Sequence, residues 1–217
     1  MPNELAVPVF AVALTLMVLV GAAVIWRYRR RESARVARGL ALDAATVIDA
    51  LGFATTPANL LYSVTLGPSG GRGMWTLVRD GDGQDAGRVG FPVANGGVIR
   101  TISCEEGDYA CHRIFGMSGD RVSLQRAGSD AIRMQFEAGA GVERYRINGE
   151  VVYERRPLSP MSPGRWRIES RGETVAVLVN LAADLDLRAQ ALIAQGELPL
   201  VDRLFILAMS DTAVAAT

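Results

Sequence analysis

The fold of this chain is decided by residues 143–154, which read ERYRINGEVVYE. Two short segments rich in β-branched and aromatic residues flank Asn148-Gly149 at the centre of this stretch. Asn-Gly is the strongest short-range signal of a β-hairpin, because a type I′ turn requires a positive φ at both central positions. We therefore predict two antiparallel strands, Glu143–Ile147 and Val151–Glu154, joined by a tight turn.

The same pattern extends outward in both directions from this hairpin. Trp166–Glu169 meets Thr174–Val179 across Arg171-Gly172, and similar short segments precede the first hairpin. Strands that are short and regularly spaced are typical of an antiparallel barrel or sandwich. No repeated strand–helix–strand pattern is present, which argues against a Rossmann-type sheet. The predicted strands outside these two hairpins are 62–66, 75–78, 88–93, 98–103, 111–117, 121–126 and 132–137.

The chain ends in two segments with helical composition, Leu185–Gln195 and Leu198–Met209. In the second segment apolar residues cover most of the circumference, and such a helix is buried or spans a membrane. This one is too short to span, and it carries Asp202 and Arg203. We therefore predict a core helix packed in or against the β-domain. The expected fold class is mainly β, an antiparallel barrel or sandwich with an apolar C-terminal helix.

This arrangement resembles the tubby-like family, which includes the phospholipid scramblases. The resemblance covers Tyr62 to Asp211 and rests on the succession of strands, the turn-bounded segment 172–176 and the terminal helix LVDRLFIL, residues 200–207. It implies a β-barrel closed around an apolar C-terminal helix, and binding of phosphoinositides or other anionic lipids. The chain differs from the family in placing an anchor before the domain and in lacking the scramblases' cysteine-rich and calcium-binding elements. The resemblance therefore assigns no site residue.

An uninterrupted apolar stretch occupies Leu5–Trp26. A membrane span needs about 20 apolar residues to cross a hydrocarbon core of about 30 Å, so we predict one transmembrane helix. Arginines cluster directly after Trp26, and flanking arginines stay on the cytoplasmic side. The N-terminus is thus expected outside and the C-terminal domain in the cytoplasm. A cleaved signal peptide is the alternative, but it has a basic n-region and a shorter apolar core, and this sequence has neither.

The predicted anchor is followed by a helix over Glu32–Leu51, in which apolar residues recur at helical spacing. Gly39 is a possible break in this helix, and Gly52 is a plausible C-cap. The sequence therefore divides into an anchor with its basic flank over 1–31, a juxtamembrane helix and connector over 32–60, and a β-rich domain over 61–217.

Composition narrows the classes of function. The formal net charge is zero, and the chain contains no lysine, which together with abundant Ala, Gly and Val is typical of a GC-rich bacterial genome. The absence of lysine excludes Schiff-base and P-loop chemistry. No basic stripe is interleaved with aromatic residues, so nucleic acid is not an expected partner. The expected location is the inner (cytoplasmic) membrane of a bacterium.

The candidate contact residues for membrane lipids or a partner lie around the end of the predicted span. Basic residues beside a membrane attract anionic lipids, although they also serve to orient a span. Trp and Tyr side chains are enriched at the interface between the membrane and water. The candidates are Trp26, Arg27, Tyr28, Arg29, Arg30, Arg31, Arg35 and Arg38.

Cys104, Cys111 and His112 are the other residues with possible chemistry. A hairpin over this segment can bring the two cysteines together as a disulfide, but the expected cytoplasmic side disfavours a persistent one. A zinc site lacks paired C-x-x-C ligands, and a six-residue spacing does not fit haem attachment. Reduced cysteines, a disulfide and a metal site all stay open. We assign no catalytic residue, cofactor or metal.

These observations favour a non-enzymatic, single-span membrane protein. We expect an accessory or scaffold subunit that meets other integral membrane subunits through its span and its cytoplasmic β-domain. Its layout is similar to that of the H subunit of purple bacterial reaction centres. The alternative is a tubby-like module that binds anionic lipids at the membrane surface.

Overall fold

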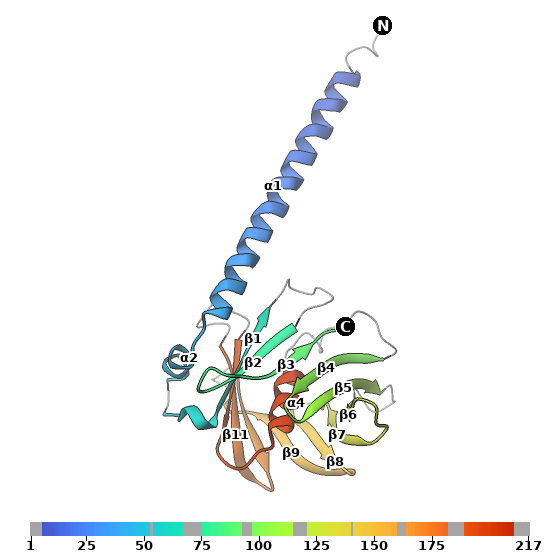
Figure 1. Cartoon of the computed structure of the whole chain (residues 1–217). Coiled ribbons are helices and arrows are strands. Elements are labelled where there is room, and N and C mark those ends of the chain that lie inside the picture. Colours follow the sequence, from blue (N-terminus) through green and yellow to red (C-terminus); the bar gives the residue numbers. More distant parts are fainter. Residues whose placement is uncertain are drawn as a thin grey trace.

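The computed structural model describes residues 6–52, 54–66, 75–92, 97–114, 121–139, 141–159, 164–181 and 189–210. Within these ranges the side chains of residues 6–13, 35 and 66 are not described. A long helix, α1 (Ala6–Leu40), projects from a β-barrel, and a short helix, α2 (Ala44–Leu51), lies where the two meet (Figure 1). A single 3₁₀ turn, η1 (Pro57–Asn59), leads into the first strand.

Twelve antiparallel strands form a closed barrel in which each strand pairs with its neighbours in the chain. β1 and β12 close the barrel, with Leu60 opposite Ile193 and Val64 opposite Ala189. The barrel alternative of the predicted fold class is thereby confirmed, and no sandwich edge is left among the described strands. The strands are β1 (Leu60–Leu66), β2 (Trp75–Asp80), β3 (Asp85–Gly90), β4 (Val98–Cys104), β5 (Gly107–Ile114), β6 (Arg121–Arg126), β7 (Ile132–Glu137), β8 (Glu143–Ile147), β9 (Glu150–Pro157), β10 (Arg165–Ser170), β11 (Glu173–Asn180) and β12 (Ala189–Ala194).

The two hairpins that decided the fold form as predicted. Asn148 and Gly149 have φ values of 51° and 84° between β8 and β9. Arg171 and Gly172 have φ values of 53° and 84° between β10 and β11. Positive φ at both central positions is the geometry of a type I′ turn, whose twist matches that of the strands it joins.

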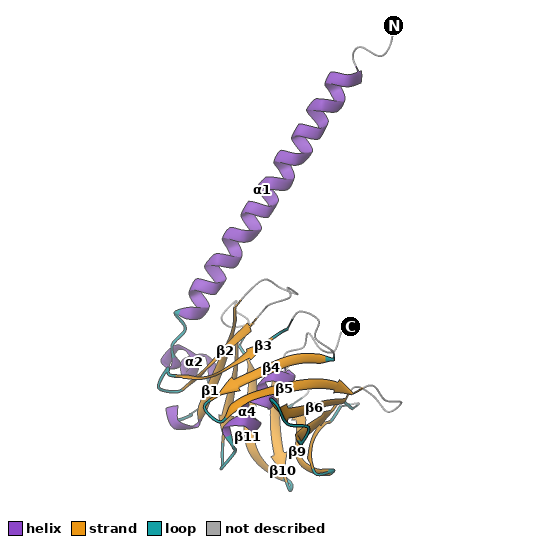
Figure 2. Cartoon of the chain, turned by 45° about the vertical axis from the view of Figure 1, so that its right-hand side comes forward, coloured by secondary structure: helices purple, strands orange, loops and turns teal. Residues whose placement is uncertain are grey.

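The C-terminal helix α4 (Leu200–Ser210) lies inside the barrel (Figure 2), as the sequence predicted. Nine of its eleven residues are buried. Phe205 at its centre meets Tyr145 of β8 edge to face, with ring centroids 6.0 Å apart, and Tyr145 also contacts Phe136 of β7. Side chains from all twelve strands complete this core around the helix. The barrel interior is therefore filled by protein.

One predicted element is wrong. The sequence predicted a helix over Leu185–Gln195, whereas Ala189–Ala194 forms strand β12 and residues 182–188 lie outside the described part. β12 is buried on both faces: Leu192 joins the core around α4, and Ala191 and Ile193 pack on the outside of the barrel. A strand buried on both sides does not show polar–apolar alternation. Because alanine and leucine are also good helix formers, the sequence of β12 was predicted to be helical.

The junction segment follows the prediction closely. α1 ends at Leu40, one residue after Gly39, and α2 begins at Ala44. Asp43 caps α2 by accepting a hydrogen bond from the Thr46 amide at 2.8 Å, and hydrogen bonds from Thr46 lower the pKa of Asp43. Gly52 ends α2 in the left-handed region with φ of 70°, as expected for a C-cap glycine.

Candidate functional site: the projecting helix and its junction with the barrel

The projecting part of α1 presents a continuous run of apolar side chains to its surroundings. Eight of them are 53 to 72 % exposed, and none packs on the barrel core. Soluble monomers rarely expose contiguous apolar patches larger than a few hundred Å², so this surface is a candidate contact surface. The residues are Leu14, Leu16, Met17, Val18, Leu19, Val20, Val24 and Ile25.

No helix within the described residues has a stretch that is long and apolar enough to cross a membrane. The predicted span begins at Leu5, which lies outside the described residues, and only the backbone is described for residues 6–13.

All of the predicted contact residues lie on α1. Trp26 and Tyr28 are exposed, and the Arg30 guanidinium lies 5.4 Å from the centre of the Trp26 ring. Cation–π pairs of this kind hold an arginine beside an aromatic ring. The arginines at 27, 29, 30, 31 and 38 are exposed, while the side chain of Arg35 is outside the described part.

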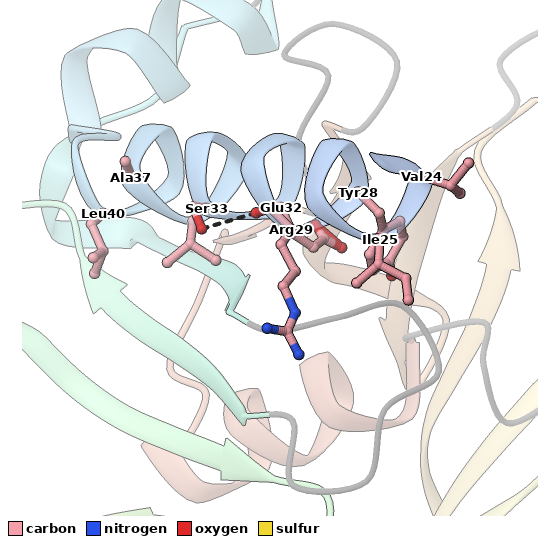
Figure 3. Close-up of a pocket in the computed structure, with 9 residues that line it drawn as sticks. Val24, Ile25, Tyr28, Arg29, Glu32, Ser33, Ala37 and Leu40 are labelled. Atoms are coloured by element: carbon pink, nitrogen blue, oxygen red, sulfur yellow. Dashed lines mark hydrogen bonds between the residues drawn. The ribbon is translucent and has the colours of Figure 1, made fainter. Parts of the chain in front are cut away.

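The helical period of 3.6 residues separates these arginines into two groups. Arg27, Arg30, Arg31 and Arg38 share one side of α1, which we call the basic stripe. Arg29 lies on the opposite side, together with apolar residues that border a groove of about 800 Å³ (Figure 3). We call this the α1 groove, and the described residues that line it are Val24, Ile25, Tyr28, Arg29, Glu32, Ser33, Val36, Ala37 and Leu40.

The end of α1 is fastened to the barrel by side chains of two strands. Arg79 of β2 donates through Nη1 to the carbonyls of Leu40 at 3.0 Å and Leu42 at 3.3 Å. The Tyr62 hydroxyl of β1 donates to the Leu42 carbonyl at 3.4 Å. The last carbonyls of a helix have no intrahelical partner and carry partial negative charge. A guanidinium at this point therefore both caps α1 and attaches it to the barrel.

Helix α2 secures the same junction on the outer surface of the barrel. Val47 and Leu51 are fully buried against an apolar cluster formed by β1, β2, β11 and β12. The Arg165 guanidinium of β10 donates to the Leu51 carbonyl at 3.4 Å. Full burial of a Val or Leu side chain contributes about 1.5–3 kcal/mol. The junction therefore ties the direction of α1 to the orientation of the barrel.

A polar network fixes the helix inside the barrel. The Asp202 carboxylate of α4 is 3 % exposed, and accepts hydrogen bonds from Arg133 Nη2 at 3.1 Å and from the Tyr153 hydroxyl at 3.0 Å. Burial, with the Asp202 charge beside it, raises the pKa of Tyr153, so the phenol stays a donor. The network holds the first turn of α4 to β7 and β9.

At the other end of α4 a small internal space is lined by polar side chains that include Arg100, Thr76 and Gln190. Its volume is about 10 Å³, which corresponds to about one water molecule. This space is too small for an organic ligand.

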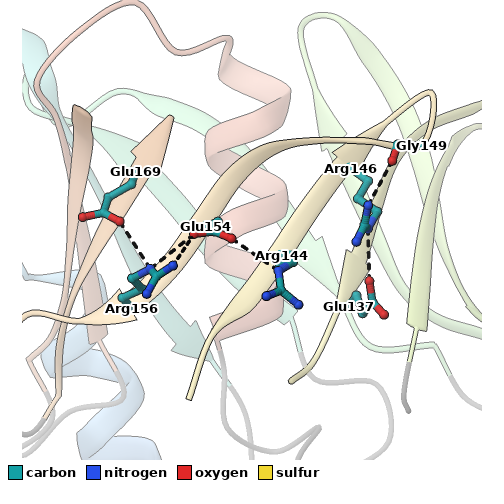
Figure 4. A network of polar contacts seen from close by, with 7 residues as sticks. All are labelled: Glu137, Arg144, Arg146, Gly149, Glu154, Arg156 and Glu169. Atoms are coloured by element: carbon teal, nitrogen blue, oxygen red, sulfur yellow. Dashed lines mark hydrogen bonds and ion pairs between the residues drawn. The ribbon is translucent and has the colours of Figure 1, made fainter. Parts of the chain in front are cut away.

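The outer surface of β6 to β10 carries two separate groups of ion pairs, most members of which are drawn in Figure 4. Glu137 accepts from Arg146 at 3.0 Å and pairs with Arg121 at 3.2 Å. Glu154 pairs with Arg156 at 2.6 Å and Arg144 at 3.3 Å, and Arg156 also reaches Glu169 at 3.4 Å. Arg146 and Arg156 lower the pKa values of Glu137 and Glu154, respectively. These carboxylates are engaged as ions, which suits a stabilising surface network rather than acid–base chemistry.

The structure separates the residues of the possible cysteine site. In the β4–β5 hairpin Cys104 lies opposite Gly107, and Cys111 lies opposite Arg100, and both thiols are free. Burial raises the pKa of Cys111 to about 12. His112 follows Cys111 on the same strand, so their side chains point to opposite faces. Among the described residues no three His, Cys, Asp or Glu side chains gather as a metal site.

Sequence reasoning missed the junction residues Arg79, Tyr62 and Arg165, because only the closed barrel brings them beside α1 and α2. It also gave no role to Asp202. An acid in an otherwise apolar helix was the available signal, since a buried charge needs a partner.

The chain matches no protein family, and no curated protein matches its sequence. Among solved structures it is similar to the X-ray structure of an Arabidopsis thaliana protein, with a TM-score of 0.46 and 13 % identity. That similarity covers 73 % of this chain and 94 % of the plant protein.

Proposed function

We propose that this protein is a single-span membrane protein that acts as an accessory or scaffold subunit of a larger membrane assembly. One observation carries the proposal: α1 projects its exposed apolar side chains away from the barrel and ends in an exposed arginine cluster. The apolar stretch from Leu5 to Trp26 is long enough for a span. The arginines favour an N-terminus outside and a barrel in the cytoplasm.

The junction supports a positioning role. Arg79 and Tyr62 cap the end of α1, and α2 is packed on the barrel directly afterwards. A helix that is fastened in this way sets both the distance and the orientation of the barrel relative to the membrane. A scaffold subunit requires this property, whereas a domain on a flexible tether lacks it.

The experiment that tests the proposal is purification of the native protein after mild detergent extraction. We expect integral membrane subunits to copurify at a fixed ratio and to stay bound through a second separation by size. A protein that leaves the membrane alone, as a homogeneous single chain, would contradict the scaffold function.

The basic stripe supports a second candidate, a tubby-like module that binds anionic lipids. The barrel closed around α4 has the layout that this resemblance implies. Basic residues near an anionic surface contribute about 1 kcal/mol each, but Arg38 lies about 17 Å along the helix from Arg27. That separation exceeds the Debye length of about 8 Å at physiological salt. Lipids can therefore account for the arginines at 27–31 better than for Arg38.

Liposome binding separates the two candidates. A lipid-binding module predicts salt-sensitive binding of a fragment beginning at Arg27 to anionic vesicles, and weaker binding after Arg30 and Arg31 are changed to glutamine. A scaffold predicts that changing Arg35 and Arg38 to glutamine in the full chain weakens copurification and that the same change in the fragment leaves vesicle binding unchanged.

A further inference from the structure

We infer that Trp75 is a second point at which this protein contacts the lipid head-group interface, so that the barrel rests against the membrane. The inference rests on the proposed membrane anchor and goes beyond both candidate functions, because it concerns a barrel residue that neither of them uses. Among the described side chains three aromatic ones are exposed, namely Trp26, Tyr28 and Trp75. Two of them lie at the end of the predicted span, and Trp75 is the one on the barrel.

Trp75 repeats the local arrangement that α1 shows at the end of the predicted span. The Arg88 guanidinium lies 5.7 Å from the centre of the Trp75 ring, and the Arg30 guanidinium lies 5.4 Å from the centre of the Trp26 ring. Trp side chains are enriched at the interface between membrane and water, where a long arginine side chain extends its charge towards water. The Trp75–Arg88 pair therefore has the chemistry of an interfacial contact.

The position of Trp75 on β2 directs it towards the membrane. Trp75, Leu77 and Arg79 alternate on the outer face of this strand, and Arg79 binds the Leu40 carbonyl at the end of α1. Trp75 lies at most about 14 Å along the strand from Arg79. In both views this end of β2 points to the side towards which α1 projects (Figures 1 and 2). The ring thus lies on the membrane side of the point where α1 is attached.

A tilt of α1 brings the two tryptophans to the same interface. Trp26 lies about 21 Å along α1 from Leu40, so an upright helix holds the barrel clear of the head groups. Membrane-spanning helices are tilted by about 20° on average and by up to about 40°. The barrel lies to one side of the α1 axis (Figure 1), so a tilt towards the barrel lowers Trp75 onto the membrane. Interfacial Trp and Arg side chains are among the groups that set such a tilt.

The ring, rather than net charge, selects a phospholipid surface as the occupant. Arg88 pairs with Asp85 at 3.8 Å, and Arg79 lies 3.7 Å from the same carboxylate. Because the charge beside Trp75 is largely balanced, the contact needs no anionic lipid. This property separates it from the second candidate function, which binds anionic lipids through the basic stripe.

Quenching of tryptophan fluorescence by brominated phospholipids tests the inference in the full chain, reconstituted into phosphatidylcholine vesicles. The chain has three tryptophans, so Trp26→Phe with Trp166→Phe leaves Trp75 as the single indole. The matched control adds Trp75→Phe and Ile132→Trp. It moves the indole to the first position of β7, at the opposite end of the barrel, where the side chain is 42 % exposed against 41 % for Trp75.

We expect lipids brominated near the head group to lower the emission of Trp75 at least about twofold, because interfacial side chains lie about 5–10 Å into the boundary between head groups and acyl chains. The indole at position 132 should not be quenched. The quenching of Trp75 should persist at about 1 M salt, where the Debye length is about 3 Å. Equal quenching at both positions, no quenching of Trp75, or its loss at high salt would each overturn the inference.

A third variant separates this inference from the proposed anchor. Trp75→Phe with Trp166→Phe leaves Trp26, which brominated lipids quench if the apolar part of α1 is inserted. Quenching of Trp26 without quenching of Trp75 would overturn the inference and leave the anchor standing. Absence of quenching at both positions would overturn the anchor as well.

Photocrosslinking supplies a second measurement that leaves Trp26 and Trp166 in place. A benzophenone amino acid replaces Trp75 or, as the matched control, Ile132 in the full chain in the same vesicles. We expect the yield of lipid adducts at position 75 to exceed that at position 132 at least about tenfold, because only the first position lies at the interface. Equal yields would contradict the contact.

Discussion

The Asp202 network offers the sharpest test of how the barrel is held together. In Asp202→Ala the Tyr153 hydroxyl and the Arg133 guanidinium lose the hydrogen bonds that they donate at 3.0 Å and 3.1 Å. Loss of one member of a buried ion pair costs about 3–5 kcal/mol. Arg133 is 35 % exposed and can turn towards water, so the lower end of that range, about 3 kcal/mol, is the expected loss of unfolding free energy.

Two further variants separate charge from shape. Asp202→Asn keeps the size of the side chain and an acceptor for Tyr153, and should cost about 1–2 kcal/mol through loss of the charge-assisted bond. Tyr153→Phe removes only the phenol, and the double variant with Asp202→Ala should show a coupling energy of about 1 kcal/mol. Urea unfolding of the full chain, followed by near-ultraviolet circular dichroism, measures all of these. If the unfolding free energy of Asp202→Ala lies within about 0.5 kcal/mol of that of the parent, the network does not fix α4 and the reasoning fails.

Three other perturbations address the core, the junction and the buried thiol. Leu204→Ala in α4 should lower the unfolding free energy by about 2–5 kcal/mol, because Leu204 is fully buried; an unchanged urea midpoint would mean that the helix is not a core element. Arg79→Met should lower the unfolding free energy by about 1–2 kcal/mol because it removes the cap of α1. It should also broaden the distribution of distances between spin labels on α1 and on the barrel. Arg88→Met, at an exposed ion pair, should cost under about 0.5 kcal/mol, and equal effects would remove the junction role. The pKa of Cys111 is raised to about 12 from 9.0, so the unfolded chain releases this proton first, and the unfolding free energy should fall as the pH rises above 9.0, by up to about 1.4 kcal/mol per pH unit. Buried phenols such as Tyr153, whose pKa is also raised, add to the fall above about pH 10. Cys111→Ala should therefore remove the fall between pH 9.0 and about pH 10 in urea titrations, and a fall that persists in this range would show that another group causes it.

The strand pattern of the barrel was predictable where turns and alternation agree. Asn148-Gly149 fixed the register of β8 and β9, because few residues tolerate positive φ at both positions of a turn. The bounds of β6 and β7 also match the sequence prediction. The closure of β1 against β12 was not predictable, since it joins segments about 130 residues apart that carry no local signal.

The failure at β12 and the missed junction share one physical cause. Ala191 and Leu192 lie in the strand that faces α4 on one side and the α2 cluster on the other, so neither side is polar. Likewise Arg79 reads in sequence as an ordinary strand arginine, and only the fold places it against the Leu40 carbonyl. Both features depend on tertiary neighbours rather than on local periodicity.

The central claim is that α1 crosses the membrane and holds the barrel on the cytoplasmic side. Protease accessibility of the C-terminal domain measures this directly, in intact right-side-out cells and in inverted vesicles from the same membranes. The account predicts that protease leaves the domain intact in cells and digests or releases it in inverted vesicles. Degradation in intact cells, or recovery of the full chain in the soluble fraction, would contradict it.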